Sequence, residues 1–177
     1  MICLFSIQTW AQSGKLFNTD NQLSSNLATQ VFQDKSGFIW IATRNGLNTY
    51  DGYHITIIKK DMSNFLGLNS NYINSIAQDE KEHILLGTNN SLLEFTGSEF
   101  LKIPMLDSKG KELATYVKQI YPLRNKDVAV ATSGYGIMLK KQDEQKCHAM
   151  KGEVEKLKYI HKLLEDKRGR LWIITED

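Results

Sequence analysis

The chain has 177 residues, of which 41% are hydrophobic and 24% charged, and its formal net charge is +2. This length and composition suit an ordinary folded chain and exclude wholesale disorder. The small net charge argues against a nucleic-acid groove and against a surface that binds anionic membranes.

The first predicted element is an apolar segment, residues 2–11, which ends in Thr9-Trp10-Ala11 before Gln12. Its apolar run and small residues are typical of a secretory signal that is cleaved after Ala11, although the usual basic start is missing. We interpret residues 1–11 as the remnant of a signal peptide, and a buried N-terminal strand is the alternative. The segment is too short to span a bilayer.

The cysteines and histidines indicate neither a disulfide framework nor a metal site. Cys3 lies in the apolar segment, which leaves Cys147 as a lone thiol. The four histidines show no ligand spacing such as H-E-x-x-H, and the chain has no C-x-x-C. We therefore expect no metal and no cofactor.

One segment recurs four times, at residues 34–43, 79–88, 123–132 and 166–175. Each copy ends in a threonine, and these threonines are 45, 44 and 43 residues apart. A period near 44 residues is the length of a propeller blade, but armadillo-type helical repeats have similar lengths. The pattern inside the repeat must therefore choose between them.

Inside each copy the pattern is typical of strands. Short β-branched or aromatic runs follow a turn sequence at residues 39–42, 84–86, 128–130 and 171–174. In the first and fourth copies Gly37 and Gly169 permit a positive φ in that turn. No helix of ordinary length fits between Asp34 and Tyr50. Because the runs are nearly continuous, we expect both faces of this strand to be buried.

The strand before each turn has apolar residues at two repeated positions. The first position holds Ala28, Ile73, Val117 and Ile160 in the four copies, and the second holds Val31, Ile76, Ile120 and Leu163. Residues three apart lie on opposite faces of a regular strand, so this strand should be covered on both sides, as it is in a radial stack of blades. A turn after each threonine leads to a third strand, at 47–50, 92–95 and 137–140. An edge-like fourth strand follows at 53–58, 99–103 and 145–150.

The sequence therefore predicts an all-β chain that folds as a partial β-propeller of four-stranded antiparallel blades. About three and a half blades would form an open ring within residues 12–177. Their expected bounds are 23–60, 68–104, 113–150 and 157–177. The open end should expose an apolar blade face, and we expect the chain to associate when expressed alone.

The first copy also carries a longer pattern over residues 23–52, Leu-Ser-Ser-Asn-x-x-x-x-Val-x-Gln-Asp-x-x-Gly-x-Ile-Trp-Ile-x-Thr-x-x-Gly-Leu-x-x-Tyr-Asp-Gly. This pattern resembles the two-component regulator propeller repeat of the sensor regions of hybrid histidine kinases in Bacteroidetes. Copies two and three depart from it, with Leu85 and Ala129 in place of tryptophan and Glu82 in place of the turn glycine. The fourth copy restores Gly169 and Trp172, and the resemblance covers residues 23–177.

The resemblance implies a non-catalytic, ligand-sensing part of an inner-membrane sensor, located in the periplasm and recognising oligosaccharides. The implied partners are the ligand and the remaining blades of the parent sensor, with a dimer as a candidate assembly. No nucleic acid and no membrane contact are expected for this segment. The chain contains none of the kinase modules, so it is not expected to be an enzyme.

Antiparallel geometry places the start of each first strand and the turn after each second strand at the same end of a blade. Amides, a guanidinium group and an aromatic ring at that end can bind a sugar without catalytic residues. Asparagine also suits tight turns, so a purely structural role stays open. The candidate ligand contacts are Asn26, Arg44, Asn45, Asn71, Asn89, Asn90 and Tyr135.

Other repeated residues are expected to be structural. Trp40 and Trp172 are equivalent to Leu85 and Ala129, which predicts that both tryptophans fill the core between blades. The repeated threonines should bond to neighbouring backbone.

Two other functions fit the sequence less well than sensing does. A propeller lyase or glycosidase needs an acid and a base or nucleophile directed at one point, and the sequence shows no inward pair of carboxylates. An intracellular interaction scaffold of the WD40 kind lacks its Gly-His and Trp-Asp signatures here.

Overall fold

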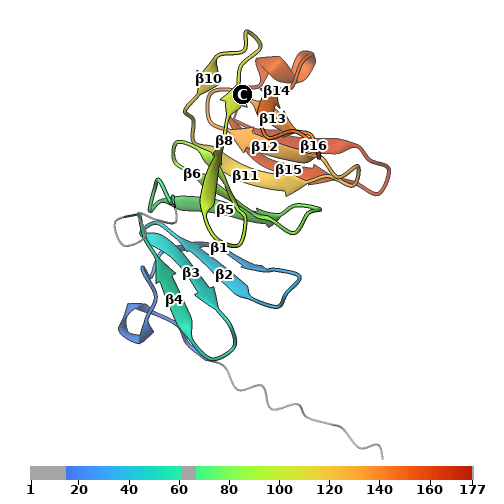
Figure 1. Ribbon diagram of the computed structural model, residues 1–177. Coiled ribbons are helices and arrows are strands. Elements are labelled where there is room, and N and C mark those ends of the chain that lie inside the picture. Colours follow the sequence, from blue (N-terminus) through green and yellow to red (C-terminus); the bar gives the residue numbers. More distant parts are fainter. Residues whose placement is uncertain (1–14, 61–66, 177) are drawn as a thin grey trace, which may run out of the picture.

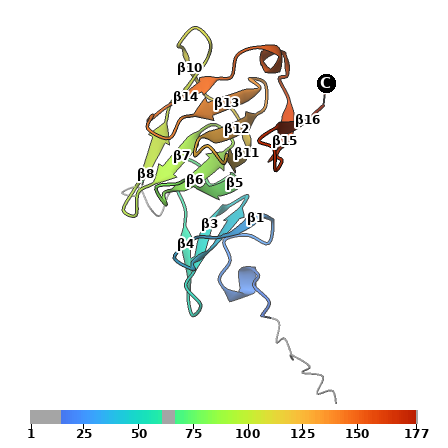
Figure 2. The ribbon, with the colours of Figure 1, turned by 90° about the vertical axis from the view of Figure 1, so that its right-hand side faces the viewer.

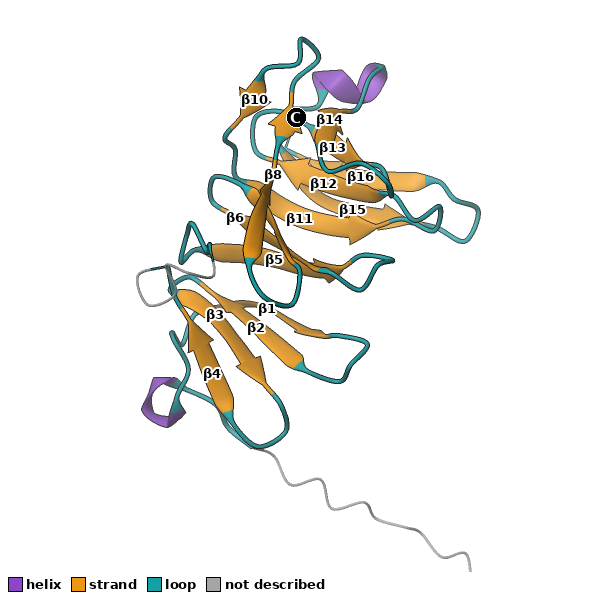
Figure 3. Ribbon diagram, viewed as in Figure 1, coloured by secondary structure: helices purple, strands orange, loops and turns teal. Residues whose placement is uncertain are grey.

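The structure is a computed structural model that describes residues 15–60 and 67–176. The segment interpreted as a signal remnant, residues 1–11, lies outside these ranges. Within them the chain consists of β-strands with short 3₁₀ helices at Thr19–Asn21 (η1) and Glu153–Lys156 (η3) (Figure 3). No helix in the described part of the chain has the length and apolarity needed to cross a bilayer.

The strands form successive antiparallel blades that stack in chain order (Figure 1). The first blade consists of β1 (Ala28–Gln33), β2 (Ile39–Thr43), β3 (Gly46–Tyr50) and β4 (Ile55–Ile58). The second consists of β5 (Ile73–Gln78), β6 (Ile84–Thr88), β7 (Leu92–Phe95) and β8 (Phe100–Ile103). The third contains β11 (Val117–Pro122), β12 (Val128–Thr132), β13 (Ile137–Lys140) and β14 (Cys147–Ala149), and the fourth contains β15 (Ile160–Glu165) and β16 (Leu171–Thr175).

The first strands of the blades are mutual neighbours. Strand β5 contacts β1 on one side and β11 on the other, and β11 also contacts β15. Both views show the blades fanning out from this row of first strands (Figures 1 and 2). The expected all-β partial propeller is therefore confirmed.

The third blade is wider than the predicted four strands. The segment that leads into it forms β9 (Met105–Leu106) and β10 (Glu112–Leu113), which extend the sheet to six strands in the order β10-β9-β14-β13-β12-β11. Strand β9 runs parallel to β14 and pairs Met105 with Cys147. These added strands cover the outer edge of the blade, where backbone groups would otherwise be unpaired.

The first strand of every blade contains a β-bulge, and for this reason the predicted orientation of its apolar residues is wrong. In β5, Ile73 pairs with Thr88 and Ile76 pairs with Leu86, with a register shift between Ile73 and Ser75. Thr88 and Leu86 are two residues apart, so Ile73 and Ile76 share one face instead of lying on opposite faces. The same shift recurs in β1, β11 and β15.

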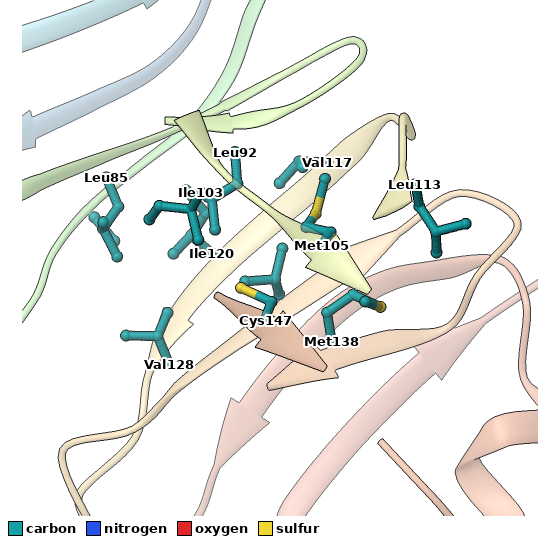
Figure 4. Packing of buried hydrophobic residues seen from close by; sticks show 12 residues of the cluster. Leu85, Leu92, Ile103, Met105, Leu113, Val117, Ile120, Val128, Met138 and Cys147 are labelled. Atoms are coloured by element: carbon teal, nitrogen blue, oxygen red, sulfur yellow. The ribbon is translucent and has the colours of Figure 1, made fainter. Parts of the chain in front are cut away.

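Apolar cores lie between successive blades. Trp40, Ala42 and Leu47 of the first blade pack with Ile73 and Ile76 of the second, among other residues. The core between the second and third blades is drawn in Figure 4 and contains Leu85, Leu92, Ile103, Met105, Val117, Ile120, Val128, Met138 and Cys147. A third core joins the third blade to β15 and β16. Each internal blade is thus buried on both faces, which is the source of the nearly continuous apolar runs.

The two tryptophans differ in burial, and for Trp172 the sequence prediction is wrong. Trp40 is 6% exposed between the first two blades, whereas Trp172 is 57% exposed. Trp172 and its neighbour Ile174 belong to the face of the fourth blade that no described blade covers. The expected apolar open face is therefore present, and association of the chain stays a prediction.

The repeated threonines bond to the turn that follows them. The hydroxyl of Thr43 donates to the carbonyl of Gly46 at 2.8 Å, and that of Thr132 donates to the carbonyl of Gly136 at 2.7 Å. Thr88 makes the same kind of bond to the carbonyl of Ser91 at 3.1 Å. These bonds supply the partner that the sequence did not specify.

Candidate functional site: the axial face of the blades

The candidate site is built from one repeated position, the residue directly before each first strand. Leu27 stands there in the first blade, and the next three blades have Tyr72, Tyr116 and Tyr159. Because the first strands are neighbours, these side chains start from adjacent points along the inner edge of the fan. Three tyrosines on adjacent blades form what we call the tyrosine row.

A hollow of about 430 Å³ opens beside the tyrosine row and is lined by the first strands of all four blades. We call it the axial hollow, and the surface around it the axial face. The extra residue of each bulge contributes to it, because a bulged residue lacks a partner in the ladder and can turn out of the sheet. These four bulge residues are Thr29, Asn74, Lys118 and His161. The hollow is also lined by Gln30, Ser75, Gln119, Ile120 and Lys162.

Two neighbouring rings of the tyrosine row lie between two cations. The guanidinium of Arg44 lies 5.6 Å from the centre of the Tyr72 ring, and the Tyr72 and Tyr116 ring centres are 6.1 Å apart. The ammonium of Lys118 lies 5.1 Å from the centre of the Tyr116 ring. Cation–ring contacts of this kind fix a flexible charged side chain in place.

Tyr116 is held as a neutral hydroxyl. Burial, followed by its hydrogen bond with Tyr72, raises the pKa of Tyr116 to about 12, while the charge of Arg44 acts in the opposite direction. The neutral hydroxyl donates to Oδ1 of Asn74 at 2.7 Å. A phenol that keeps its proton can stack on or hydrogen-bond to a ligand without adding negative charge.

The amide nitrogen of Asn74 is buried and has no hydrogen-bond partner among the described residues. Buried donors are almost always paired, and leaving one unpaired costs about 1–3 kcal/mol. Asn74 also lines the axial hollow, so an acceptor atom bound there would satisfy this donor once the side chain turns the enclosed nitrogen toward it.

The predicted asparagines have local structural bonds. Asn71 accepts the Gly46 amide with its carbonyl and the Lys60 amide with its side chain, each at 2.7 Å. Asn26 bonds twice to Thr19. The side chain of Asn45 bonds to Ser24, that of Asn89 to Ser70, and that of Asn90 to Thr88.

Two predicted contacts remain. Arg44 joins the tyrosine row, and Tyr135 is 49% exposed in the turn between β12 and β13 of the third blade. Sequence reasoning missed Tyr72, Tyr116 and Tyr159, although their spacing of 44 and 43 residues matches the repeat. It also missed the unpartnered amide of Asn74, which only the packing reveals.

A second polar group lies between the second and third blades. Nδ1 of His83 is 2.7 Å from Oε1 of Glu94 and 3.8 Å from Oδ2 of Asp79, and Lys140 Nζ is 4.0 Å from that Asp79 oxygen. Both carboxylates and Lys140 are buried. The ligand atoms of the two acids and His83 lie within 4.8 Å of one another and could hold a metal ion, but the Lys140 ammonium already supplies a cation. From the sequence we predicted neither this pair of buried carboxylates nor their contact with His83.

A second hollow, of about 420 Å³, lies between the first two blades at the end where β1 turns into β2. Phe38, Trp40 and Phe95 line it together with His83. Asp34 also lines this hollow, and its carboxylate oxygens already accept the Trp40 ring N–H at 2.7 Å and the Phe38 amide at 3.0 Å. This hollow therefore has room for a ligand but, among the described residues, lacks an unpartnered donor such as the one on the axial face.

Comparison with known families supports the repeat. The model of the two-component regulator propeller matches residues 22–45, 67–90 and 156–177. Comparison with curated proteins gives no match.

Comparison with solved structures finds the same fold. The extracellular domain of BT4673 from B. thetaiotaomicron, assigned as a hybrid two-component system, aligns with a TM-score of 0.70 at 18% identity over 90% of this chain and 22% of that one. The corresponding domain of BT3049 gives a TM-score of 0.63 at 19% identity over 82% of this chain and 20% of that one. PorZ, a surface component of the type-IX secretion system of Porphyromonas gingivalis, gives 0.63 at 17% identity over 86% and 25%.

This chain thus spans about a fifth to a quarter of the length of these relatives. Their identities are low, so the similarity concerns the fold. Together, the stacked blades and the solved structures identify the chain as a partial β-propeller, three segments of which match the two-component regulator propeller repeat.

Proposed function

We propose that this chain is a non-catalytic, ligand-sensing propeller segment of an extracytoplasmic two-component sensor, and that its axial face binds an oligosaccharide. The repeat and the similarity to extracellular sensor domains support the sensing role. The parent protein would be a sensor histidine kinase of the inner membrane, and this segment would work in the periplasm beside the remaining blades of the parent.

One observation carries the assignment of the ligand site. Tyr116 of the tyrosine row donates to Asn74, and the unpartnered amide of Asn74 belongs to the wall of a hollow lined by all four blades. Aromatic faces suit the apolar faces of sugar rings, and a few fixed polar groups select orientation. A ligand held by several blades at once would also change how those blades sit against each other, which is a means of signalling.

The test measures oligosaccharide binding to the full chain by isothermal titration calorimetry, with a panel of neutral and acidic oligosaccharides. Tyr72→Ala and Arg44→Ala should each weaken binding about ten-fold or more, because each removes one face of the site. Tyr53→Ala is the matched control, since Tyr53 is 84% exposed on the first blade outside the axial hollow. Tyr135→Ala tests the remaining predicted contact.

Two outcomes would reject the proposal. Unchanged affinity in Tyr72→Ala and Arg44→Ala would remove the axial face as the site. Release of a cleaved product during incubation would instead favour a lyase or glycosidase. A reporter fused after Ala11 would show whether the segment is exported.

A further inference from the structure

The axial hollow contains hydrogen-bond donors in excess, and this excess identifies the chemistry of its ligand. Its lining includes two lysines, Lys118 and Lys162, and the unpartnered amide nitrogen of Asn74. An ammonium group is only a donor, and an amide –NH₂ is only a donor as well. No aspartate or glutamate lines the described hollow.

The two lysines are not neutralised by acids. The ion pairs of the described residues include neither Lys118 nor Lys162. Glu176 pairs with a residue of the wall: its Oε1 lies 2.5 Å from Nε2 of His161, and its side chain is 63% exposed. The hollow therefore has two positive charges without an acidic partner. A third cation, the Arg44 guanidinium, lies on Tyr72 in the adjoining tyrosine row.

Neutral sugars match this arrangement poorly. A sugar hydroxyl is both a donor and an acceptor, so it brings hydrogens to a surface that already has too many. A carboxylate or sulfate group brings only acceptor oxygens, and hydrogen bonds between charged partners are about twice as strong as neutral ones.

We propose that the axial hollow binds an acidic group, a carboxylate or a sulfate, of an oligosaccharide that stacks on the tyrosine row. This inference rests on the proposed function and specifies the ligand class of the same site. Lys118 donates to the anionic group, as does Asn74 Nδ2 once it turns toward the hollow, and Lys162 adds charge from the fourth blade. The Tyr72 and Tyr116 rings contact the sugar.

The experiment uses matched pairs of ligands on the full chain. Oligogalacturonides are compared with their fully methyl-esterified forms, and sulfated chondroitin tetrasaccharides with desulfated ones, by calorimetry. We expect binding of at least one acidic member, at least ten-fold weaker binding of its neutral partner, and a loss of affinity as salt rises from about 0.05 to about 0.5 M.

Variants locate the effect. Asn74→Asp keeps the shape of the side chain and its bond from Tyr116 but replaces the donor with a negative charge, so it should abolish binding of the acidic ligand. Lys118→Met should weaken that binding about ten-fold or more. Lys141→Met is the control, because Lys141 is exposed at the other end of the third blade and loses the same charge. If Lys118→Met unfolds the chain, Lys162→Met provides the same test from an exposed residue.

The outcomes separate this inference from the proposed function. Equal affinity for acidic and neutral partners, with no effect of Asn74→Asp, would overturn the acidic class and leave the axial sugar site standing. Binding of acidic ligands that Lys141→Met weakens as much as Lys118→Met would show only general charge attraction and would also overturn it. If no member of either series binds, both proposals fail.

Discussion

The side-chain amide of Gln30 bonds to both backbone groups of Ile76 on the next blade. Its Nε2 donates to the Ile76 carbonyl at 2.8 Å, and its Oε1 accepts the Ile76 amide at 2.9 Å. Gln119 forms the same pair of bonds with Leu163, one blade interval apart. At the joint between them, Ser75 accepts the amide of Ile120 at 3.0 Å. Adjacent first strands are therefore joined by side chains instead of by a continuous ladder.

This clamp leads to the first prediction. Gln30→Ala removes both bonds and leaves two backbone groups of Ile76 without partners, so the free energy of unfolding should fall by about 1–3 kcal/mol. Gln33→Ala is the control, because Gln33 bonds only to the nearby carbonyl of Gly37 at the surface and should change stability by about 0.5 kcal/mol or less. Urea denaturation followed by tryptophan fluorescence measures both. Equal effects of the two substitutions would show that the clamp does not stabilise the stack.

The second prediction uses two tryptophans in equivalent places. Each ring N–H donates to the aspartate six residues earlier, Trp40 to Asp34 and Trp172 to Asp166. Trp40→Ala should lower the free energy of unfolding by about 3–5 kcal/mol, because it leaves a cavity between two blades. Trp172→Ala should lower it by only about 1 kcal/mol or less, since most of that ring is already in water. Similar losses would mean that Trp172 is buried in solution, as it would be in an associated form of the chain.

The third prediction concerns the turn between the first two strands. Gly37 and Gly169 have φ values of 92° and 76° there, and Glu82 has 66° at the equivalent place in the second blade. A side chain in this left-handed region costs about 1–2 kcal/mol. Glu82→Gly should therefore be more stable than Glu82→Ala by about 1 kcal/mol, a comparison that also removes the exposed ion pair with Lys35 from both variants.

Thermal unfolding of the two variants measures this difference. The adjacent Lys81 serves as the control, because its φ is not positive and Lys81→Gly should be less stable than Lys81→Ala by about 0.5–1 kcal/mol. A preference for alanine at position 82 would show that the turn relaxes out of the left-handed region.

The fourth prediction concerns Cys147, which is free and buried in the core between the second and third blades. Burial raises the pKa of its thiol to about 12, while the Lys140 charge acts the other way. A thiol with a raised pKa in the folded state holds its proton more tightly there than in the unfolded state. Its contribution to stability is therefore complete below about pH 9 and is lost as the pH rises toward 12.

Two measurements check this behaviour in a chain that carries Cys3→Ser, so that Cys147 is its single thiol. The thiol should react with an aromatic disulfide reagent at pH 8 only as fast as the chain opens, and denaturant should speed the reaction greatly. Above pH 9 the free energy of unfolding should fall more steeply than in the same chain with Cys147→Ala. Rapid labelling of the native chain would place the thiol at the surface.

The sequence by itself determined the architecture, because blade structure repeats. Three nearly equal spacings between four copies, a turn before each second strand and a threonine after it can be read directly from the sequence, and they recur because each blade needs the same backbone geometry. The repeated threonines were recognised as structural for this reason, and their bonds to the following turn confirm it.

Only the tertiary structure decided the rest, since it depends on contacts between blades. The bulge reverses the facing of residues such as Ile73, and no local pattern announces it. Trp172 looks like Trp40 in sequence and differs only in whether a blade covers it. The axial site unites single residues from segments about 44 residues apart, and the unpartnered Asn74 amide exists only through what surrounds it. Spacing can predict a blade, but the charge and hydrogen-bond balance of a shared surface arises when the blades pack.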